Sequence, residues 1–179
     1  LTVLSSQAVD IQDRGANRSF TILTDQAAAW QADGQITIEP VTGMDDVATL
    51  KAQLDGKKRI SGERNSLVLI EEGKDASDIH NLRILSGQVL VTFDRPVNLT
   101  RKSQDLGVTL TAPKSGNAGN FALAKSAEAF DALDLADSLK GKAGVLSAEP
   151  ILLKMHTKKL LPNDTHFGDQ WHLRNTGQN

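Results

Sequence analysis

The residues best suited to chemistry gather near the C-terminal end of the chain. Asp164, His166, Asp169 and His172 follow one another there, and carboxylate oxygens and imidazole nitrogens are both accepted by Zn²⁺. A zinc site needs three or four ligands at a defined spacing, which this segment lacks. Asp164 on its own is a hard carboxylate on an irregular segment, which is typical of Ca²⁺ sites, although Ca²⁺ takes six to eight oxygens. Asp164 as a solvated turn or cap residue is the alternative.

Basic residues and further histidines form a second group of candidates. The pair Lys158-Lys159 lies in a connector without periodicity and predicts a processing site with Lys159 before the cut, although a solvated linker has the same composition. Lys57-Lys58-Arg59 is interpreted as an exposed loop. His80 and His156 are candidate pH-dependent triggers, because histidine changes charge close to neutral pH, or ordinary surface residues.

Composition sets the class of protein that must position these residues. The chain has 179 residues, of which 39% are hydrophobic and 23% charged, as in a soluble chain with one or two small domains. The net charge of −2 gives no basic excess for nucleic acid or an anionic membrane, so neither is an expected partner. The absence of cysteine excludes disulfides, thiolate catalysis and Cys-ligated zinc.

The pattern of apolar residues predicts an α+β fold in two domains. Residues 1–84 form an expected N-terminal α+β domain of unknown role, with strands and one helix. Residues 85–153 have the order β-α-β-β-α-β, which is the split βαβ arrangement. The expected elements of the first domain are strands over Phe20–Thr24, Gln35–Glu39 and Ser66–Ile70, and a helical pattern from Met44 to Leu54 that Gly56 closes. Those of the second are strands over Gln88–Phe93, Gly107–Thr111, Asn120–Ala124 and Val145–Pro150, a helix over Asn98–Leu106 with Asn98 or Thr100 as cap, and a helix from Ser126 to Lys140 with Ser126 as cap.

The last segment, from Pro162 to Asn179, reads PNDTHFGDQWHLRNTGQN. It resembles the opening of the mature catalytic domain of subtilisin-like serine proteases, most closely in the kexin and proprotein-convertase branch and its bacterial relatives. Thr165 departs from that opening, because the family usually has Pro there. The matching residues are Asn163-Asp164, Phe167, Gln170-Trp171-His172-Leu173 and Asn175-Thr176-Gly177-Gln178.

A second resemblance lies just upstream. Gly144 to Pro150 reads GVLSAEP, which is similar to the last strand of the propeptides of the same family. Those propeptides commonly fold as a ferredoxin-like sheet with two helices on one face. The order of the two resemblances implies a ferredoxin-like propeptide domain over residues 85–153, followed over residues 154–179 by a processing linker and the start of a catalytic domain.

The resemblance also implies a function. The chain would be the pro-region of a secreted subtilisin-like serine endopeptidase, either secreted fully or held in the periplasm or at the cell surface, with a signal peptide outside this chain. It would act as intramolecular chaperone, because a largely parallel catalytic fold forms slowly. It would also act as inhibitor, with a C-terminal tail of about Ile151 to Lys159 added as a strand in the substrate cleft.

The resemblance assigns roles to residues near the C-terminus. Asp164 would help to bind a structural calcium ion whose other ligands come from the catalytic domain. Phe167, Trp171 and His172 would pack onto that domain. The expected partner is therefore a subtilisin-like catalytic domain, in cis or as the other cleaved fragment.

The catalytic residues of that family are not found in this chain. No histidine is followed by Gly, and no Ser follows Gly-Thr, so the His-Gly-Thr and Gly-Thr-Ser contexts are missing. Asp105-Leu106-Gly107 fits Asp-x-Gly but lies in the propeptide-like part. We expect no peptidase activity from this chain by itself, although its parent protein would be a serine endopeptidase.

Two other functions fit part of the sequence. A free-standing protease inhibitor or α+β protein-binding module would use the same kind of sheet, but it would not need Gln170-Trp171-His172-Leu173. An unrelated interaction protein would use residues 1–84, and a ligand pocket there would favour it.

Overall fold

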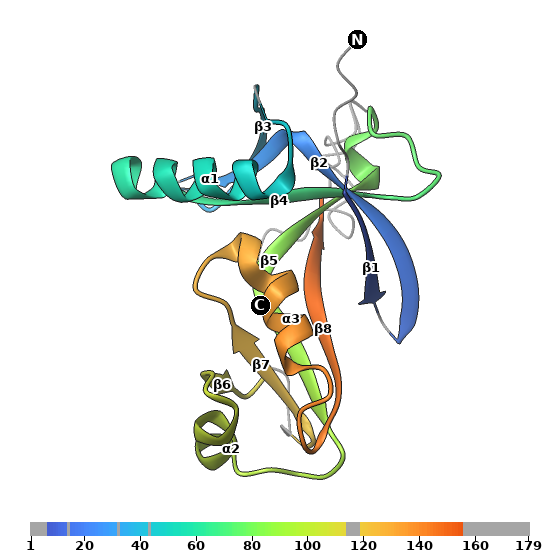
Figure 1. The fold of residues 1–179 in the computed structure, drawn as a ribbon, viewed down its shortest axis with the longest axis vertical. Coiled ribbons are helices and arrows are strands. Elements are labelled where there is room, and N and C mark those ends of the chain that lie inside the picture. The colour runs from blue at the N-terminus through green and yellow to red at the C-terminus, as the bar shows by residue number, and fades with distance from the viewer. Residues whose placement is uncertain (1–6, 14, 32, 43, 114–118, 156–179) are drawn as a thin grey trace, which may run out of the picture.

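The computed structural model describes residues 7–13, 15–31, 33–42, 44–113 and 119–155. Within these ranges eight strands form one antiparallel sheet that is accompanied by three α-helices and two 3-10 turns, so the fold is of the α+β class (Figure 1). In chain order the elements are β1 (Gln7–Asp13), β2 (Ala16–Trp30), β3 (Ile36–Pro40), α1 (Val47–Ser61), β4 (Arg64–Glu71), η1 (Ile79–Asn81), β5 (Leu82–Phe93), α2 (Leu99–Leu106), β6 (Leu110–Thr111), β7 (Phe121–Lys125), η2 (Ala129–Asp131), α3 (Ala132–Leu139) and β8 (Val145–Lys154).

The sheet has an upper and a lower half, and β5 and β8 run through both (Figure 1). The upper half contains β1 to β4 and α1, in the strand order β1-β2-β4-β5, with β3 paired to the second half of β2. The lower half has the order β8-β5-β7-β6 and contains α2 and α3. Strand β5 pairs with β4 over Leu82–Ile84 and with β7 over Gln88–Thr92. The expected domain boundary between residues 84 and 85 therefore falls inside β5.

A bulge at Gly87 marks the bend between the halves. Between Leu85 and Val89 the register of β5 against β8 shifts, so β5 carries extra residues that β8 does not match. Gly87 has φ 80°, and a Cβ there would lie 2.9 Å from the Cα of Ala129. Both the left-handed backbone and the close approach require glycine at this position.

Helix α1 is longer than the sequence predicts. It begins at a cap in which Asp46 Oδ1 accepts a hydrogen bond of 2.7 Å from the Thr49 N–H, and it ends at Gly62 in the left-handed region. The expected end at Gly56 is wrong, because a glycine inside a helix costs only about 1 kcal/mol. The basic run Lys57–Arg59 therefore lies in the last turns of α1 and not in a loop.

The helices of the lower half follow the expected order with changed ends. Asn98 caps α2, accepting 3.0 Å from the Arg101 N–H, as predicted. Ser126 does not cap a helix: its hydroxyl donates to the carbonyls of Gly87 (2.9 Å) and Glu128 (2.5 Å), and α3 begins only at Ala132. Gly107 ends α2 with φ 68°, so only Leu110–Thr111 of the strand expected over Gly107–Thr111 pairs.

One hydrophobic core extends through both halves. It lies on the face of the sheet that α1, α2 and α3 cover, and it includes Leu50 and Leu69 from the upper half and Val91 and Leu139 from the lower half. A second, smaller cluster lies on the opposite face of the upper half, and its buried members are Ala28, Val68, Ile70, Leu82 and Ile84. In the upper half both faces of the sheet are therefore packed.

Candidate functional site

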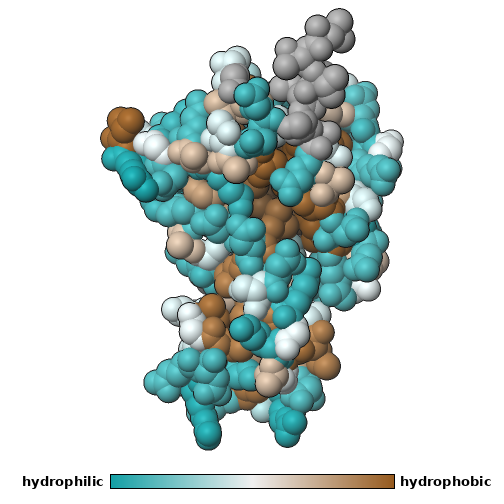
Figure 2. Space-filling model, viewed as in Figure 1, coloured by the Kyte–Doolittle hydropathy of each residue, from teal (hydrophilic) through white to brown (hydrophobic). Residues whose placement is uncertain are grey.

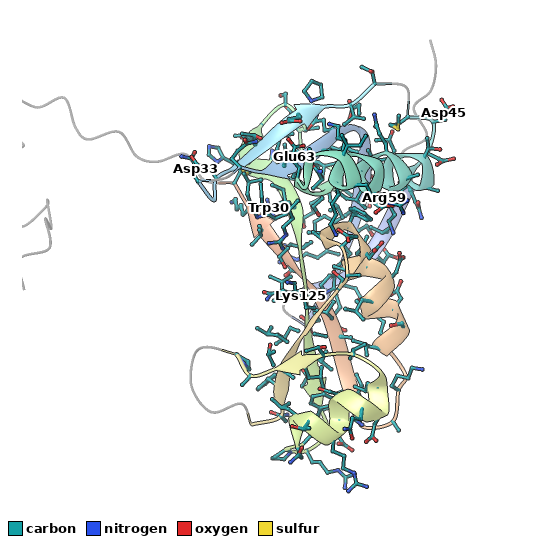
Figure 3. All side chains as sticks on the ribbon, turned by 90° about the vertical axis from the view of Figure 1, so that its left-hand side faces the viewer. Trp30, Asp33, Asp45, Arg59, Glu63 and Lys125 are labelled. Carbon is teal, nitrogen blue, oxygen red and sulfur yellow. The ribbon has the colours of Figure 1, made fainter. Side chains whose placement is uncertain are left out.

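Among the described residues, the lower half of the sheet has one face without a covering helix. Along β5, Val89, Val91 and Phe93 are fully buried toward the helices, while Leu90 and Thr92 alternate with them and are half-buried. Successive side chains of a strand point to opposite faces, so Leu90 and Thr92 point away from the helices. Helices α2 and α3 lie on the same side of these strands (Figures 1 and 3), which leaves the other face open within the described part of the chain.

Strand β7 has its larger side chains on this open face. Ala122 and Ala124 are fully buried against the helices, whereas Phe121 is 43% exposed and Leu123 is half-buried. Leu90 is the cross-strand partner of Leu123, and Thr92 that of Phe121, so these four side chains are neighbours. We call Leu90, Thr92, Phe121 and Leu123, with Ser147 and Glu149 of β8 beside them, the open-face patch.

The structure accounts for three positions of the motif from Gly144 to Pro150, which are Gly144, Ala148 and Glu149. Gly144 has φ 77°, and a Cβ there would lie 3.4 Å from Lys102 Nζ. Ala148 is fully buried in the main core on the helix side, where a larger side chain would disturb close packing. Glu149 pairs with Leu90 and so belongs to the open-face patch.

Lys102 fixes the loop that precedes β8. Its Nζ donates 2.7 Å to the Ala143 carbonyl and lies 5.8 Å from the centre of the Phe93 ring. Beside it, hydrogen bonds from the Arg95 side chain lower the pKa of Asp94 below its usual value. The turn that starts β8 is therefore held to the end of β5.

Strand β8 continues beyond the motif. Leu152, Leu153 and Lys154 pair with Leu85, Ile84 and Arg83. The expected tail starts at about Ile151, so its first residues lie in the sheet. Directly after the strand, the carbonyl oxygen of Met155 lies 3.4 Å from His80 Nδ1.

The two halves are joined by ion pairs on the helix side. Lys51 Nζ of α1 lies 2.6 Å from Asp134 Oδ2 and 3.8 Å from Asp131 Oδ1, and Lys58 pairs with Glu128. Burial raises the pKa of Asp131, and the neighbouring Asp134 and Glu128 carboxylates add to this, whereas Lys51 opposes it. This side also carries apolar surface between the halves, in a shallow depression lined by Val9, Ile22, Val47 and Leu133 (Figure 2).

A cation–aromatic stack involves Trp30 of the upper half, and Lys125 lies at the narrow waist between the halves (Figure 3). The Arg64 guanidinium carbon lies 4.4 Å from the centre of the Trp30 ring, and Arg64 also donates to the carbonyl of Ser86. Lys125 at the end of β7 is exposed. Because the Ser86 carbonyl is part of the bulge, Arg64 stabilises the bend itself.

The described residues do not bring a catalytic triad together. His80 is the histidine within them, and its ring Nδ1 lies 3.4 Å from the Met155 carbonyl oxygen. The match of Asp105-Leu106-Gly107 to Asp-x-Gly is explained by Gly107, which is the left-handed cap of α2. Elsewhere in the described ranges, no group of three or more His, Asp or Glu residues is placed to hold a metal ion.

The site residues predicted from the C-terminal segment lie outside the described residues. They are Lys158, Lys159, Asp164, Phe167, Trp171 and His172. The open-face patch was not predicted. Its signal is the alternation of Phe and Leu with Ala in β7, which places the small side chains under the helices.

Comparisons with known proteins give no relative for this chain. No family model matches the sequence, and neither a curated protein nor a solved structure matches it. Among the described helices, none has the length and apolar character needed to cross a membrane.

Proposed function

We propose that this chain is the pro-region of a subtilisin-like serine endopeptidase and acts as its folding aid and inhibitor. The observation that carries the proposal is the lower half of the sheet, which has helices on one face and the open-face patch on the other. This half is followed along the chain by the connector and the protease-like opening from Pro162. The order along the chain is therefore a docking face, a strand that leads away from it and then the protease-like opening. This is the order expected of such a pro-region.

The fold of the lower half is proposed to be ferredoxin-like. Its elements follow the order β5-α2-β6-β7-α3-β8, and its strands lie in the order β8-β5-β7-β6 with antiparallel pairing throughout. Strands β5 and β6 therefore run in the same direction with β7 between them, which is the geometry of a split βαβ unit. This order supports the ferredoxin-like assignment and, with it, the resemblance of residues 144–150 to the propeptide strand.

The open-face patch is the proposed docking surface for the catalytic domain. Leu90, Phe121 and Leu123 form its apolar centre, with Thr92 and Glu149 beside them. An apolar centre with a polar rim is typical of a surface that becomes buried in a complex. Docking would place the end of β8 and the residues after it near the enzyme surface, where they could enter the substrate cleft as an added strand.

The remaining assignments belong to the same proposal. Cleavage would follow Lys159, after the dibasic pair with Lys158. Asp164 would contribute one oxygen to a calcium site that the catalytic domain completes, and Phe167, Trp171 and His172 would pack against that domain. The parent enzyme would act outside the cytoplasm, either secreted, in the periplasm or at the cell surface.

A mixture of the chain with a subtilisin-like catalytic domain tests this function. We expect the chain to inhibit peptide hydrolysis, and we expect Leu123→Asp to raise the inhibition constant at least tenfold, because it places an unpaired charge in the interface. The matched control is Ile60→Asp, which makes the same change at a side chain that is 91% exposed on α1 in the upper half. Equal inhibition by the unchanged chain, Leu123→Asp and Ile60→Asp would show that the open-face patch is not the docking surface. No inhibition by any of the three would refute the proposed function.

A free-standing inhibitor is the second candidate, and one observation favours it. The described residues from β1 to β8 form a hydrophobic core, with a second cluster on the opposite face of the upper half. Deletion of residues 160–179 separates the two functions. After this deletion a free-standing inhibitor would still inhibit, but it would leave the refolding rate of the catalytic domain unchanged. A pro-region with the same deletion would still speed the refolding of the catalytic domain.

A further inference from the structure

The end of β8 belongs to the upper half of the sheet. The last pairs of β8 with the lower part of β5 are Val89↔Pro150 and Leu90↔Glu149, on one side of the bulge. On the other side, Leu85↔Leu152, Ile84↔Leu153 and Arg83↔Lys154 join β8 to the part of β5 that pairs with β4. The residues that follow the propeptide-like motif are therefore fixed by the N-terminal part of the chain.

Side chains on both faces of the sheet hold this end of β8. Leu152 packs against the main core, on the helix side. Leu153 and Met155 pack against the second cluster on the opposite face, which includes Val68 and Ile84. Removing these residues from the sheet would expose apolar surface on both of its faces and break the backbone pairing with β5.

The loop before β5 contacts the point at which the strand ends. Arg83 Nη1 donates to the carbonyls of His80 (3.0 Å) and Leu82 (2.9 Å), which orders the turn from η1 into β5. His80 Nδ1 then lies 3.4 Å from the Met155 carbonyl oxygen. The first residue after β8, Met155, is therefore in contact with η1.

This anchoring limits how far a tail can reach. An extended residue spans about 3.3 Å. A tail that starts after Lys154 and not after Pro150 is therefore shorter by about 13 Å, the length of four extended residues. Residues 151–154 are then not available to enter a cleft.

We propose that the upper half of the sheet holds residues 151–154, so that these residues are not part of the tail that a protease cleft receives. The inference rests on the proposed function and gives residues 7–84 a role, which is to set the length and register of the inhibitory tail. Residues 151–154 stay in the sheet when the catalytic domain binds.

A disulfide across the end of β8 tests this directly. Arg83 and Lys154 are cross-strand partners at the edge of the upper half, and antiparallel partners are close enough for a disulfide. The natural chain has no cysteine, so the double variant Arg83→Cys/Lys154→Cys can form only the intended bond within one molecule. The matched control is Gln12→Cys/Asn17→Cys, another cross-strand pair, in the β1–β2 hairpin.

Inhibition of a subtilisin-like serine protease is measured for each double variant, oxidised and reduced. We expect the oxidised and reduced forms of Arg83→Cys/Lys154→Cys to have inhibition constants within threefold of each other. A loss of inhibition of tenfold or more on oxidation of this pair, with no change in the control pair, would overturn the inference and leave the proposed function standing. No inhibition by any form would refute the proposed function and, with it, this inference.

Hydrogen exchange tests whether residues 152–154 are held in the sheet, whichever protease is used. In the free chain of 179 residues, we expect the amides of residues 152–154 that face β5 to exchange as slowly as those of β5 itself. Adding the protease should leave them protected. Fast exchange in the free chain, or loss of protection in the complex, would overturn the inference whatever the inhibition constant.

Discussion

The upper and lower halves of this sheet differ in how many of their faces are packed. In the upper half, α1 and the main core cover one face and the second cluster lies on the other. In the lower half, α2 and α3 cover one face and leave Leu90, Phe121 and Leu123 on the other. The same antiparallel sheet thus provides a two-sided scaffold and a one-sided docking face.

This difference indicates where stability and function reside. A sheet with both faces packed loses stability when its side chains are shortened, because each one fills space in a core. A face that is open in the free chain contributes less to stability, so its side chains can be chosen for a partner. The bulge at Gly87 joins the two halves, and substitutions there should affect both.

The largest effect is expected at the bulge. Gly87→Ala should lower the free energy of unfolding by about 4 kcal/mol, because it combines a left-handed φ with a Cβ placed 2.9 Å from the Ala129 backbone. Gly73→Ala is the control, with φ 76° but open space around the new Cβ, and should cost about 1 kcal/mol. Urea unfolding of both variants measures the difference, and equal losses would show that the approach of Ala129 does not matter.

Shortening one leucine in each half should separate the scaffold from the docking face. Leu69→Ala in the upper core should cost about 3 kcal/mol, because the side chain is fully buried. Leu90→Ala on the open face should cost about 1 kcal/mol, since the side chain is only half-buried. Chemical denaturation measures the loss in the free energy of unfolding for each variant. A loss for Leu90→Ala as large as that for Leu69→Ala would mean that the open face is part of a core.

The cap of α2 should give a smaller effect in the lower half. Asn98→Ala removes the side-chain acceptor of the Arg101 N–H and should cost about 1 kcal/mol. Thr100→Ala, at the other cap position that the sequence allows, should change stability by less than about 0.5 kcal/mol. Thermal unfolding followed by circular dichroism compares the two. A larger loss of stability for Thr100→Ala than for Asn98→Ala would place the start of the helix at Thr100.

The smallest effect is expected from Asp131, between the halves. Its pKa is raised above 3.8, first by burial, so the folded protein binds its proton more tightly than the unfolded chain does. Wild-type stability should therefore rise as the pH falls through the raised pKa toward 3.8. Asp131→Asn should be slightly more stable than wild type at pH 7, and the difference should disappear in acid. Melting temperatures between pH 3 and pH 7 test this, and a wild type more stable at pH 7 would show that the Lys51 pair outweighs burial.

The sequence predicts the elements of the lower half because its signals are local. The alternation in Gln88–Phe93 and the cap at Asn98 each fall within a few residues, and both agree with the structure. Gly56 and Ser126 mislead, because a glycine inside a helix costs only about 1 kcal/mol and because the Ser126 hydroxyl donates to the Gly87 carbonyl.

The extent of β5 and β8 depends on contacts between distant parts of the chain. The pairing of Leu82–Ile84 with β4 extends β5 in one direction, and Leu152–Lys154 then follow it. Nothing within Ile151–Lys154 alone distinguishes a paired strand from a free tail. The open-face patch depends in the same way on which face α2 and α3 cover, although the alternation of Phe121 and Leu123 with alanines points to it.

The most direct test of the central claim is the inhibition of a subtilisin-like catalytic domain by the intact chain. The account predicts tight, competitive inhibition that Leu123→Asp weakens at least tenfold and that Ile60→Asp leaves unchanged. Absence of inhibition and of binding by the intact, folded chain would contradict the assignment as a protease pro-region.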